Sequence, residues 1–316
     1  MTFSPRLTPG ADPPEPPVAL AEEVAEALRS GQPVVALETT LVSHGFPGRQ
    51  GLEVALAAEE RVRAAGAVPA TVGVVDGTVR AGLTKAELER FAAAGESARK
   101  VGARDLAACV VQGALGATTV GGTLAVCRMA GIHFMGTGGT GGVHRDFARS
   151  LDISSDLPQI ARTPAMVVSS GAKSILDVAA TTELLETLSV PVLGWRTATL
   201  PLFYSAGGGP PVSAVVTTPE EAARIASAHW QLNGPSGLLL ARPPDPSVDI
   251  EPIITEAVSR VRDQGMSGPS VTPAVLSLVH ELSEGRSVTV NRLLIADNAA
   301  LAAEVAVAHA REAAAA

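Results

Sequence analysis

The segment from residue 34 to residue 75, VVALETTLVSHGFPGRQGLEVALAAEERVRAAGAVPATVGVV, decides the fold. It opens with a short apolar run over residues 34–37. Apolar residues then recur at helical spacing over about residues 52–65, up to Gly66, and a second apolar run covers residues 71–75. A strand, a helix and another strand in this order are typical of a βαβ unit in a parallel sheet.

The same alternation continues along the chain. Asp76-Gly77 is a turn signal leading into a strand over residues 78–82. Thr84, with Glu87 three residues later, predicts a capping box for a helix that reaches about Ala94. We expect further strands over residues 106–111, 132–135, 165–169, 190–194 and 238–241, and helices over residues 18–30, 118–129, 173–188, 219–232, 250–263, 272–283 and 292–313.

This pattern predicts the α/β class: one α/β/α domain over residues 18–316 with a mainly parallel sheet. Residues 1–17 are rich in proline and are expected to form a flexible leader. Since ligands of such sheets bind at the carboxyl ends of the strands, the chemistry is expected in the loops that follow strands.

Composition excludes several classes of protein. Of the 316 residues, 46% are hydrophobic, which argues against disorder, and the net charge of −8 provides no basic surface for nucleic acid. We find no run of about 18 apolar residues without Gly, Pro or charge, and no signal peptide. Cys109 and Cys127 do not make a disulfide framework. We therefore expect a cytoplasmic protein without nucleic-acid or membrane partners.

Lysine usage is selective, because the chain has 21 arginines but only Lys85, Lys100 and Lys173. Unlike arginine, lysine can lose its proton and form a Schiff base. Lys173 follows a strand at the predicted start of a helix, where the helix dipole disfavours a cation and favours a neutral nucleophile. Lys100 is interpreted as a phosphate ligand, as a charge that lowers the pKa of Lys173, or as a surface residue.

Glu38 directly follows the first strand, and partial burial there would raise its pKa into a range useful for a general acid. The alternative is a solvated glutamate. Five glycines lie within residues 136–142, followed by His144 and Arg145. Such a loop can bind a phosphate through its backbone N–H groups, although it is not a Walker loop and can also be a structural turn.

Residues 151–157, LDISSDL, place Asp152 and Asp156 around two hydroxyls. These oxygens suit a hard metal such as Mg²⁺ or Mn²⁺, and the alternative is a capped helix start. Among the histidines, His44 is the better candidate, since His133 and His280 lie in apolar surroundings. A nucleophilic lysine, an acid, a phosphate loop and a metal together fit imine chemistry on a phosphorylated sugar.

The order of these segments resembles the pseudouridine-5'-phosphate glycosidases, from about Val34 to the C-terminal helix. This family makes or breaks the C–C bond between C1' of ribose 5-phosphate and a carbon of uracil. The resemblance rests on residues 36–40 with 43–45, 66–71 with 76–77, Lys100 with 104–105, 116–120, 137–145, 152–156 and 171–177.

The resemblance implies an α/β/α fold, a homotrimer and roles for single residues. Lys173 would form the Schiff base with C1', Glu38 would donate a proton to the leaving carbon, and Asp152 would bind a divalent metal, usually Mn²⁺, with Mg²⁺ as an alternative. A C-glycoside lacks the basic oxygen that other glycosidases protonate, so an iminium electrophile is needed. Substrate contacts would come from Lys100, Val120, Thr137, His144, Arg145, Ser154, Ser155, Asp156 and Asn291.

Three segments depart from the family pattern. An Asn-Pro-x-Pro stretch is replaced by residues 241–246, an Arg/Ser-rich segment by residues 205–211, and an Asn-Asn pair by Asp297-Asn298. Because uracil needs amide-type partners, we expect a C-glycosynthase that joins ribose 5-phosphate to an aromatic carbon, as in alnumycin-type antibiotic biosynthesis. The alternatives are an ordinary pseudouridine-5'-phosphate glycosidase and a non-enzymatic sugar-phosphate sensor.

Overall fold

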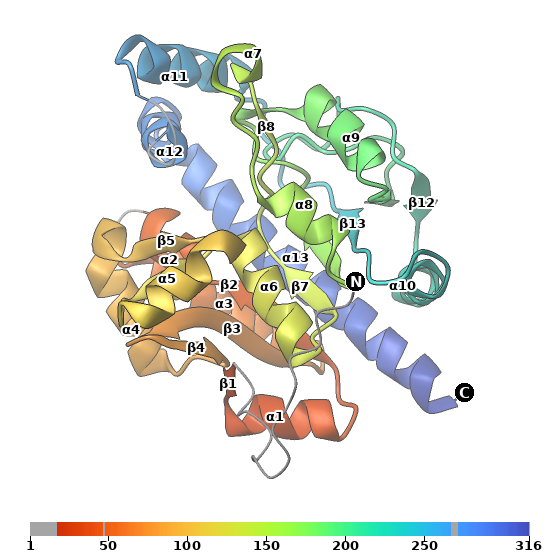
Figure 1. The fold of residues 1–316 in the computed structure, drawn as a ribbon. Helices are drawn as coiled ribbons and strands as arrows, with labels where there is room; N and C mark the ends of the chain where they lie inside the picture. Colours follow the sequence, from red (N-terminus) through yellow and green to blue (C-terminus); the bar gives the residue numbers. More distant parts are fainter. Residues whose placement is uncertain (1–17, 47, 267–270, 316) are drawn as a thin grey trace, which may run out of the picture.

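The computed structural model describes residues 18–46, 48–266 and 271–315, so the predicted leader lies outside the described residues. Its main sheet is mostly parallel, and only β3 pairs antiparallel, with β4 and β6. The predicted α/β class is therefore confirmed (Figure 1). The strand order is β1 (Ala19–Leu20), β4 (Thr78–Ala81), β3 (Val68–Val75), β2 (Val34–Glu38), β7 (Phe134–Gly136), β9 (Met166–Ser169), β13 (Leu238–Ala241), β11 (Val192–Trp195) and β12 (Ala214–Val216), with β5 (Arg99–Val101) and β6 (Gly116–Thr118) attached to β3.

Helices cover both faces of the sheet, because alternate strand residues point to opposite sides. In β2, Val35 and Leu37 belong to one core and Val34 and Ala36 to the other. The first core is covered by α3 (Gln50–Ala64), α4 (Lys85–Ala94), α10 (Pro219–Asn233), α11 (Glu251–Asp263), α12 (Val271–Leu282) and α13 (Arg286–Ala315). The second is covered by α1 (Glu22–Arg29), α5 (Leu106–Val111), α6 (Val120–Ala130), α8 (Asp156–Ala161) and α9 (Val178–Thr187).

The long helix α13 crosses the sheet on the side opposite α6 and α8 (Figure 1). It is long and apolar enough to span a membrane by length and composition, but 56% of its apolar window is buried inside the protein. It packs against β7 so closely that a Cβ on Gly136 would lie 2.8 Å from the Cα of Ala299. These contacts are those of a core helix.

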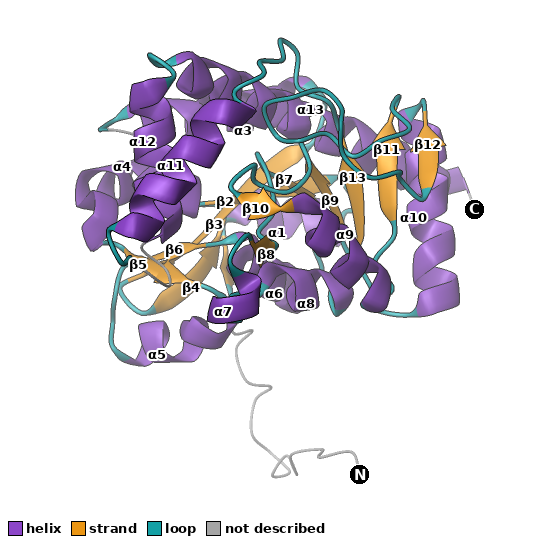
Figure 2. Cartoon of the chain, turned by 90° about the horizontal axis from the view of Figure 1, so that it is seen from above, coloured by secondary structure: helices purple, strands orange, loops and turns teal. Residues whose placement is uncertain are grey.

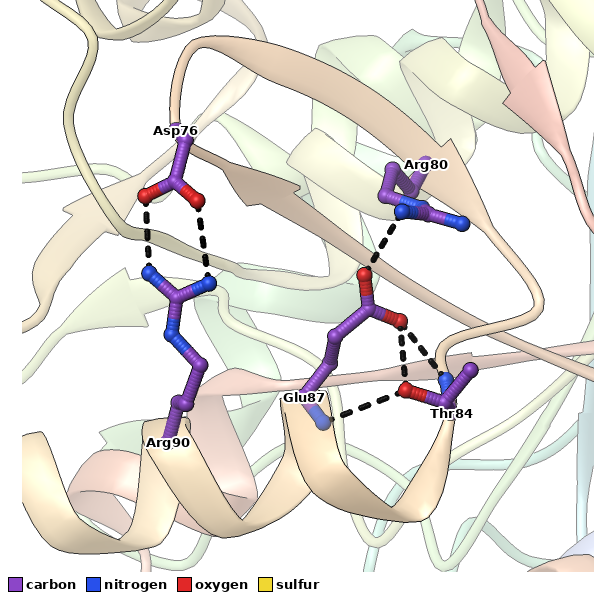
Figure 3. A network of polar contacts seen from close by, with 5 residues as sticks. All are labelled: Asp76, Arg80, Thr84, Glu87 and Arg90. Carbon is purple, nitrogen blue, oxygen red and sulfur yellow. Dashed lines mark hydrogen bonds and ion pairs between the residues drawn. The ribbon is translucent and has the colours of Figure 1, made fainter.

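The predicted capping box at α4 is confirmed (Figure 3). The Thr84 hydroxyl accepts a hydrogen bond from the Glu87 backbone N–H at 3.2 Å, and the Thr84 N–H donates to the Glu87 carboxylate at 2.8 Å. Arg80 on β4 pairs with the same carboxylate at 2.7 Å, and Arg90 pairs with Asp76 in the β3–β4 turn. These contacts fix α4 on the hairpin.

Three sequence predictions are wrong. The helix predicted over residues 18–30 begins only at Glu22, because Ala19–Leu20 form the strand β1, which pairs with β4. Residues 106–111 form the helix α5 rather than a strand: Leu106 and Cys109 are buried at helical spacing, and a short apolar run does not by itself separate the two structures. The helix predicted over residues 173–188 begins only at Val178, where the Asp177 carboxylate accepts from Ala180 N–H at 2.9 Å. Lys173 thus precedes the helix, and the helix-dipole argument for it fails.

A two-stranded sheet and a short helix lie beside the main sheet. The strands β8 (Val143–His144) and β10 (Leu176–Asp177) form a separate two-stranded sheet, which Figure 2 shows near α7 (Phe147–Ser150) and α9. The short helix α2 (Thr40–His44) follows β2 directly. Both lie at the carboxyl ends of the main strands, where ligands of parallel sheets bind.

Candidate active site

A cavity that is partly open to solvent lies at the carboxyl ends of β2, β7 and β9. It brings together five residues predicted for the site, from segments far apart in the sequence. The apolar part of its wall includes Phe203, Leu276 from α12 and Ile295 from α13. These five residues are Glu38, Lys100, Thr137, Lys173 and Asn291, and His44, the better candidate among the histidines, lines the cavity as well.

Glu38 is the last residue of β2, and its side chain is buried, with 4% exposed. The Thr137 hydroxyl donates to its Oε1 at 2.5 Å. Burial raises the pKa of Glu38 above its usual range, and the opposing influence of the Lys173 charge is smaller. The carboxyl group is therefore suited to keep a proton and to donate it within the cavity.

The two lysines of the cavity come from different parts of the sheet. Lys100 lies on β5, and burial, followed by the positive charge of Lys173, lowers the pKa of Lys100. Lys173 follows β9, and its backbone N–H donates to Thr140 of the glycine-rich loop at 3.0 Å. The Arg145 guanidinium donates to the Ser174 carbonyl at 2.7 Å, which helps to fix the turn after Lys173.

Protein contacts hold the glycine-rich loop. The amide of Asn298 donates to the Thr137 carbonyl at 2.8 Å and to the Ser170 hydroxyl at 3.1 Å. A Cβ on Gly141 would lie 2.1 Å from the Ser154 Oγ, so no larger residue fits there. The glycines therefore serve close packing, while Gly138 and Gly139 also line the cavity.

Asp156 connects this loop to α6. Its carboxylate is buried and accepts from the backbone N–H groups of Gly121 at 2.7 Å and Gly141 at 2.9 Å. Ser154 Oγ accepts from the Asp156 N–H at 3.2 Å. Four residues predicted to contact the substrate lie at the starts of α6 and α8, and none of them is among the described residues that line the cavity. They are Val120, Ser154, Ser155 and Asp156.

A second cavity, also partly open to solvent, lies next to the first along the same loop and helix. Lys173 and Leu276 line the first cavity, and Ile175 and Val275 line the second. Its polar residues include three more residues predicted for the site. One of them, Arg145, already pairs through its guanidinium with Glu251 at 2.7 Å. These groups are His144, Arg145 and Asp152.

The surroundings of Asp152 bear on the predicted metal. The His144 ring nitrogen lies 3.7 Å from its carboxylate, and the Asp152 side chain is about one-third exposed. Within residues 18–46, 48–266 and 271–315 no three or more His, Cys, Asp or Glu side chains gather as a metal cluster. One accessible carboxylate fits an ion that keeps most of its water, as Mg²⁺ does, and does not fit a protein cage.

The sequence pointed to Asn298 only as half of an altered Asn-Asn pair and did not reveal its role, which is to position the loop that carries Thr137. The available signal was a polar residue within the apolar run of residues 293–308. Two of the departures from the family pattern contact each other, because Arg242 pairs with Asp297 at 3.1 Å. Asp297 also pairs with Arg61 at 2.5 Å. Neither Arg242 nor Asp297 is among the described residues that line the first cavity.

Comparison with known proteins identifies the family of the chain. Residues 23–308 match the family model described as indigoidine synthase A like protein. The chain belongs to this family. Among relatives named pseudouridine-5'-phosphate glycosidase, that of Chloroflexus aurantiacus is 45% identical over 296 residues, covering 91% of this chain and 97% of the relative. That of Streptomyces griseus subsp. griseus is 46% identical over 312 residues, covering 96% and 95%.

Solved structures of this family have the same fold. The prealnumycin C-glycosynthase AlnA, in complex with ribulose 5-phosphate, superposes with a TM-score of 0.86 at 40% identity, covering 95% of this chain and 99% of AlnA. An indigoidine synthase A-like protein of Thermotoga maritima gives a TM-score of 0.81 at 34% identity, covering 92% and 95%. The family predicted from the sequence is therefore confirmed.

Proposed function

We propose that the protein is a pseudouridine-5'-phosphate glycosidase, which reversibly cleaves its substrate into uracil and ribose 5-phosphate. The observation that carries this proposal is the buried Glu38 in one cavity with Lys173. The names of the relatives at 45–46% identity support it. This function was the alternative in the sequence analysis, and the comparisons favour it over a C-glycosynthase.

The reaction is simplest to follow in the direction of synthesis. The aldehyde carbon of open-chain ribose 5-phosphate condenses with the Lys173 amine and takes up one proton, which releases water and leaves an iminium at C1'. C5 of uracil attacks C1', the iminium π electrons become the nitrogen lone pair, and Glu38 takes the proton from C5. The 4'-hydroxyl then displaces the amine from C1' and passes its proton to it. Cleavage is the reverse, with the Glu38 carboxyl protonating C5.

The remaining predicted residues that line the two cavities would hold the substrate. We propose that Lys100 and Asn291 contact it in the first cavity, and that His144 and Arg145 act near its phosphate. Asp152 would hold a hydrated Mn²⁺ or Mg²⁺, whose positive charge would offset the negative charge of the phosphate. We further propose that residues 18–316 act as one catalytic domain, in the cytoplasm and as a homotrimer.

A C-glycosynthase is the second candidate, because the similarity to AlnA extends over 95% of the chain. The residues that depart from the family pattern speak less strongly against uracil than the sequence suggested. Arg242 and Asp297 pair with each other, and Asn291 still lines the first cavity, with a buried amide oxygen that has no partner among the described residues. We propose that Asn291 supplies an amide-type partner for uracil.

The two candidates are separated by their substrates. Purified protein with Mn²⁺ is incubated with pseudouridine 5'-phosphate, and free uracil is measured by chromatography. The proposal predicts sustained release of uracil and, in the reverse assay, its consumption with ribose 5-phosphate. A folded protein that releases no uracil, yet couples ribose 5-phosphate to a polycyclic aromatic carbon nucleophile, would establish the C-glycosynthase instead.

A further inference from the structure

His44 carries a hydrogen-bond acceptor to which the reaction outlined above assigns no role. It is the last residue of α2, six residues after Glu38, and it is one of the residues that line the first cavity. Its Nε2 lies 3.0 Å from the Ala98 carbonyl. Because a carbonyl oxygen only accepts, Nε2 must carry the hydrogen. In the neutral ring this leaves Nδ1 as an acceptor.

That acceptor is buried and lacks a partner. Nδ1 is shielded from solvent and makes no hydrogen bond within the described part of the chain. Burial lowers the pKa of His44, the Lys100 cation acts in the same direction, and Glu96 and the Ala98 carbonyl oppose it. The neutral ring, with its lone pair on Nδ1, is therefore favoured. A buried acceptor without a donor is costly and calls for an explanation. Since His44 is one of the residues that line the cavity, a ligand bound there is one source of the missing donor.

The proposed substrate has such a donor in the reacting ring. Uracil joined through C5 retains hydrogens on N1 and N3, so the base itself brings two N–H groups. When C5 attacks the iminium, the electrons leave the C5–C6 double bond, and the positive charge that develops at C6 is shared with N1. An acceptor on N1–H stabilises that charge in the transition state, whereas an acceptor on N3–H does not.

We infer that the Nδ1 atom of His44 accepts a hydrogen bond from N1–H of the uracil ring, which makes His44 a residue that selects and activates the base. This inference rests on the proposed function. It assigns the base to the part of the cavity between α2 and Lys100. It also predicts that a base without a hydrogen on N1 is a poor substrate.

The test combines one variant with one change of substrate. His44→Gln can retain an amide N–H near Ala98 while removing the acceptor at the Nδ1 position. The rate kcat/KM is measured for pseudouridine 5'-phosphate, for its 1-methyl derivative and for its 3-methyl derivative. We expect His44→Gln to lower kcat/KM for the parent by ~10- to ~100-fold. For the 1-methyl derivative the variant should change kcat/KM by less than ~3-fold, because that substrate has no N1–H and already lacks the hydrogen bond to His44. The 3-methyl derivative should respond as the parent does.

Controls separate this effect from damage to the fold. His280→Gln replaces another half-buried histidine with an unpartnered Nε2, outside the cavity, and should leave all three rates unchanged. Trapping of ribose 5-phosphate on Lys173 should be as complete in His44→Gln as in wild type. If His44→Gln lowers the parent and 1-methyl rates equally, or lowers neither, the inference is wrong while the proposed function stands. If wild type releases no uracil, the proposed function fails and the inference falls with it.

Discussion

Asp156 offers a sharp test of how the site is built, because the sequence assigned it to the substrate and the structure shows it holding two backbone segments. Its two carboxylate oxygens accept from Gly121 N–H in α6 and Gly141 N–H in the glycine-rich loop. The variant Asp156→Asn retains one oxygen and turns an NH₂ group toward the other backbone N–H. One buried donor then loses its partner.

The size of the effect follows from these contacts. An unsatisfied buried N–H costs about 1–3 kcal/mol, and the lost negative charge at the N-terminus of α6 adds about 0.3–1 kcal/mol. We therefore expect the free energy of unfolding to fall by about 1–4 kcal/mol without any ligand present. The measurement is a urea titration of both proteins at equal concentration, followed by circular dichroism.

Asp152→Asn is the matched control. Asp152 is a nearby carboxylate with about one-third of its side chain exposed, and its loss should change stability by less than about 0.5 kcal/mol. If Asp156→Asn unfolds at the same urea concentration as wild type, the structural assignment of Asp156 is refuted. A loss of stability as large in Asp152→Asn would equally refute it, because the effect would not depend on the two backbone contacts.

Three further predictions concern single groups. Glu38→Gln should still trap ribose 5-phosphate on Lys173 but lose ~100-fold or more of its uracil release; a variant that retains turnover would exclude Glu38 as the acid. Burial raises the pKa of Glu38, so the stability that the neutral carboxyl contributes is lost as pH rises from the usual glutamate range through that raised pKa, and the rate of cleavage falls over the same pH range. Glu38→Gln should abolish this pH dependence of stability. An equal dependence of stability on pH in the variant would contradict the prediction. Thr84→Ala should cost about 1 kcal/mol in urea unfolding by removing the α4 cap, and an unchanged midpoint would contradict that assignment.

The sequence predicted the parts of the fold that depend on strong local patterns. The alternation of apolar runs predicted the parallel sheet, and Thr84 with Glu87 predicted a cap that the structure shows. Residues 106–111 were misassigned because Leu106 and Cys109 define a helical face too short to recognise from periodicity. The start of α9 was placed too early because the turn after Lys173 is set by contacts with distant residues, such as that of Arg145 with the Ser174 carbonyl.

The candidate site was predictable where a residue ends a strand or directly follows it. Glu38 is the last residue of β2 and Thr137 follows β7, and the structure joins them by a hydrogen bond. What the sequence could not provide is the partner of each polar group. It did not show that the Asp156 oxygens are taken by backbone N–H groups, or that Arg242 and Asp297, both departures from the family pattern, form an ion pair. Such pairings join residues far apart in the chain and depend on tertiary structure.

The most direct test of the central claim is to identify the residue that reacts with the sugar. The protein is incubated with ribose 5-phosphate and borohydride, digested and analysed by mass spectrometry, with Lys173→Arg and Lys100→Arg in parallel. The account predicts a reduced pentose-phosphate adduct on Lys173 in wild type and Lys100→Arg, and no adduct in Lys173→Arg. An adduct on Lys100, or none in the folded wild-type protein, would contradict imine chemistry at Lys173.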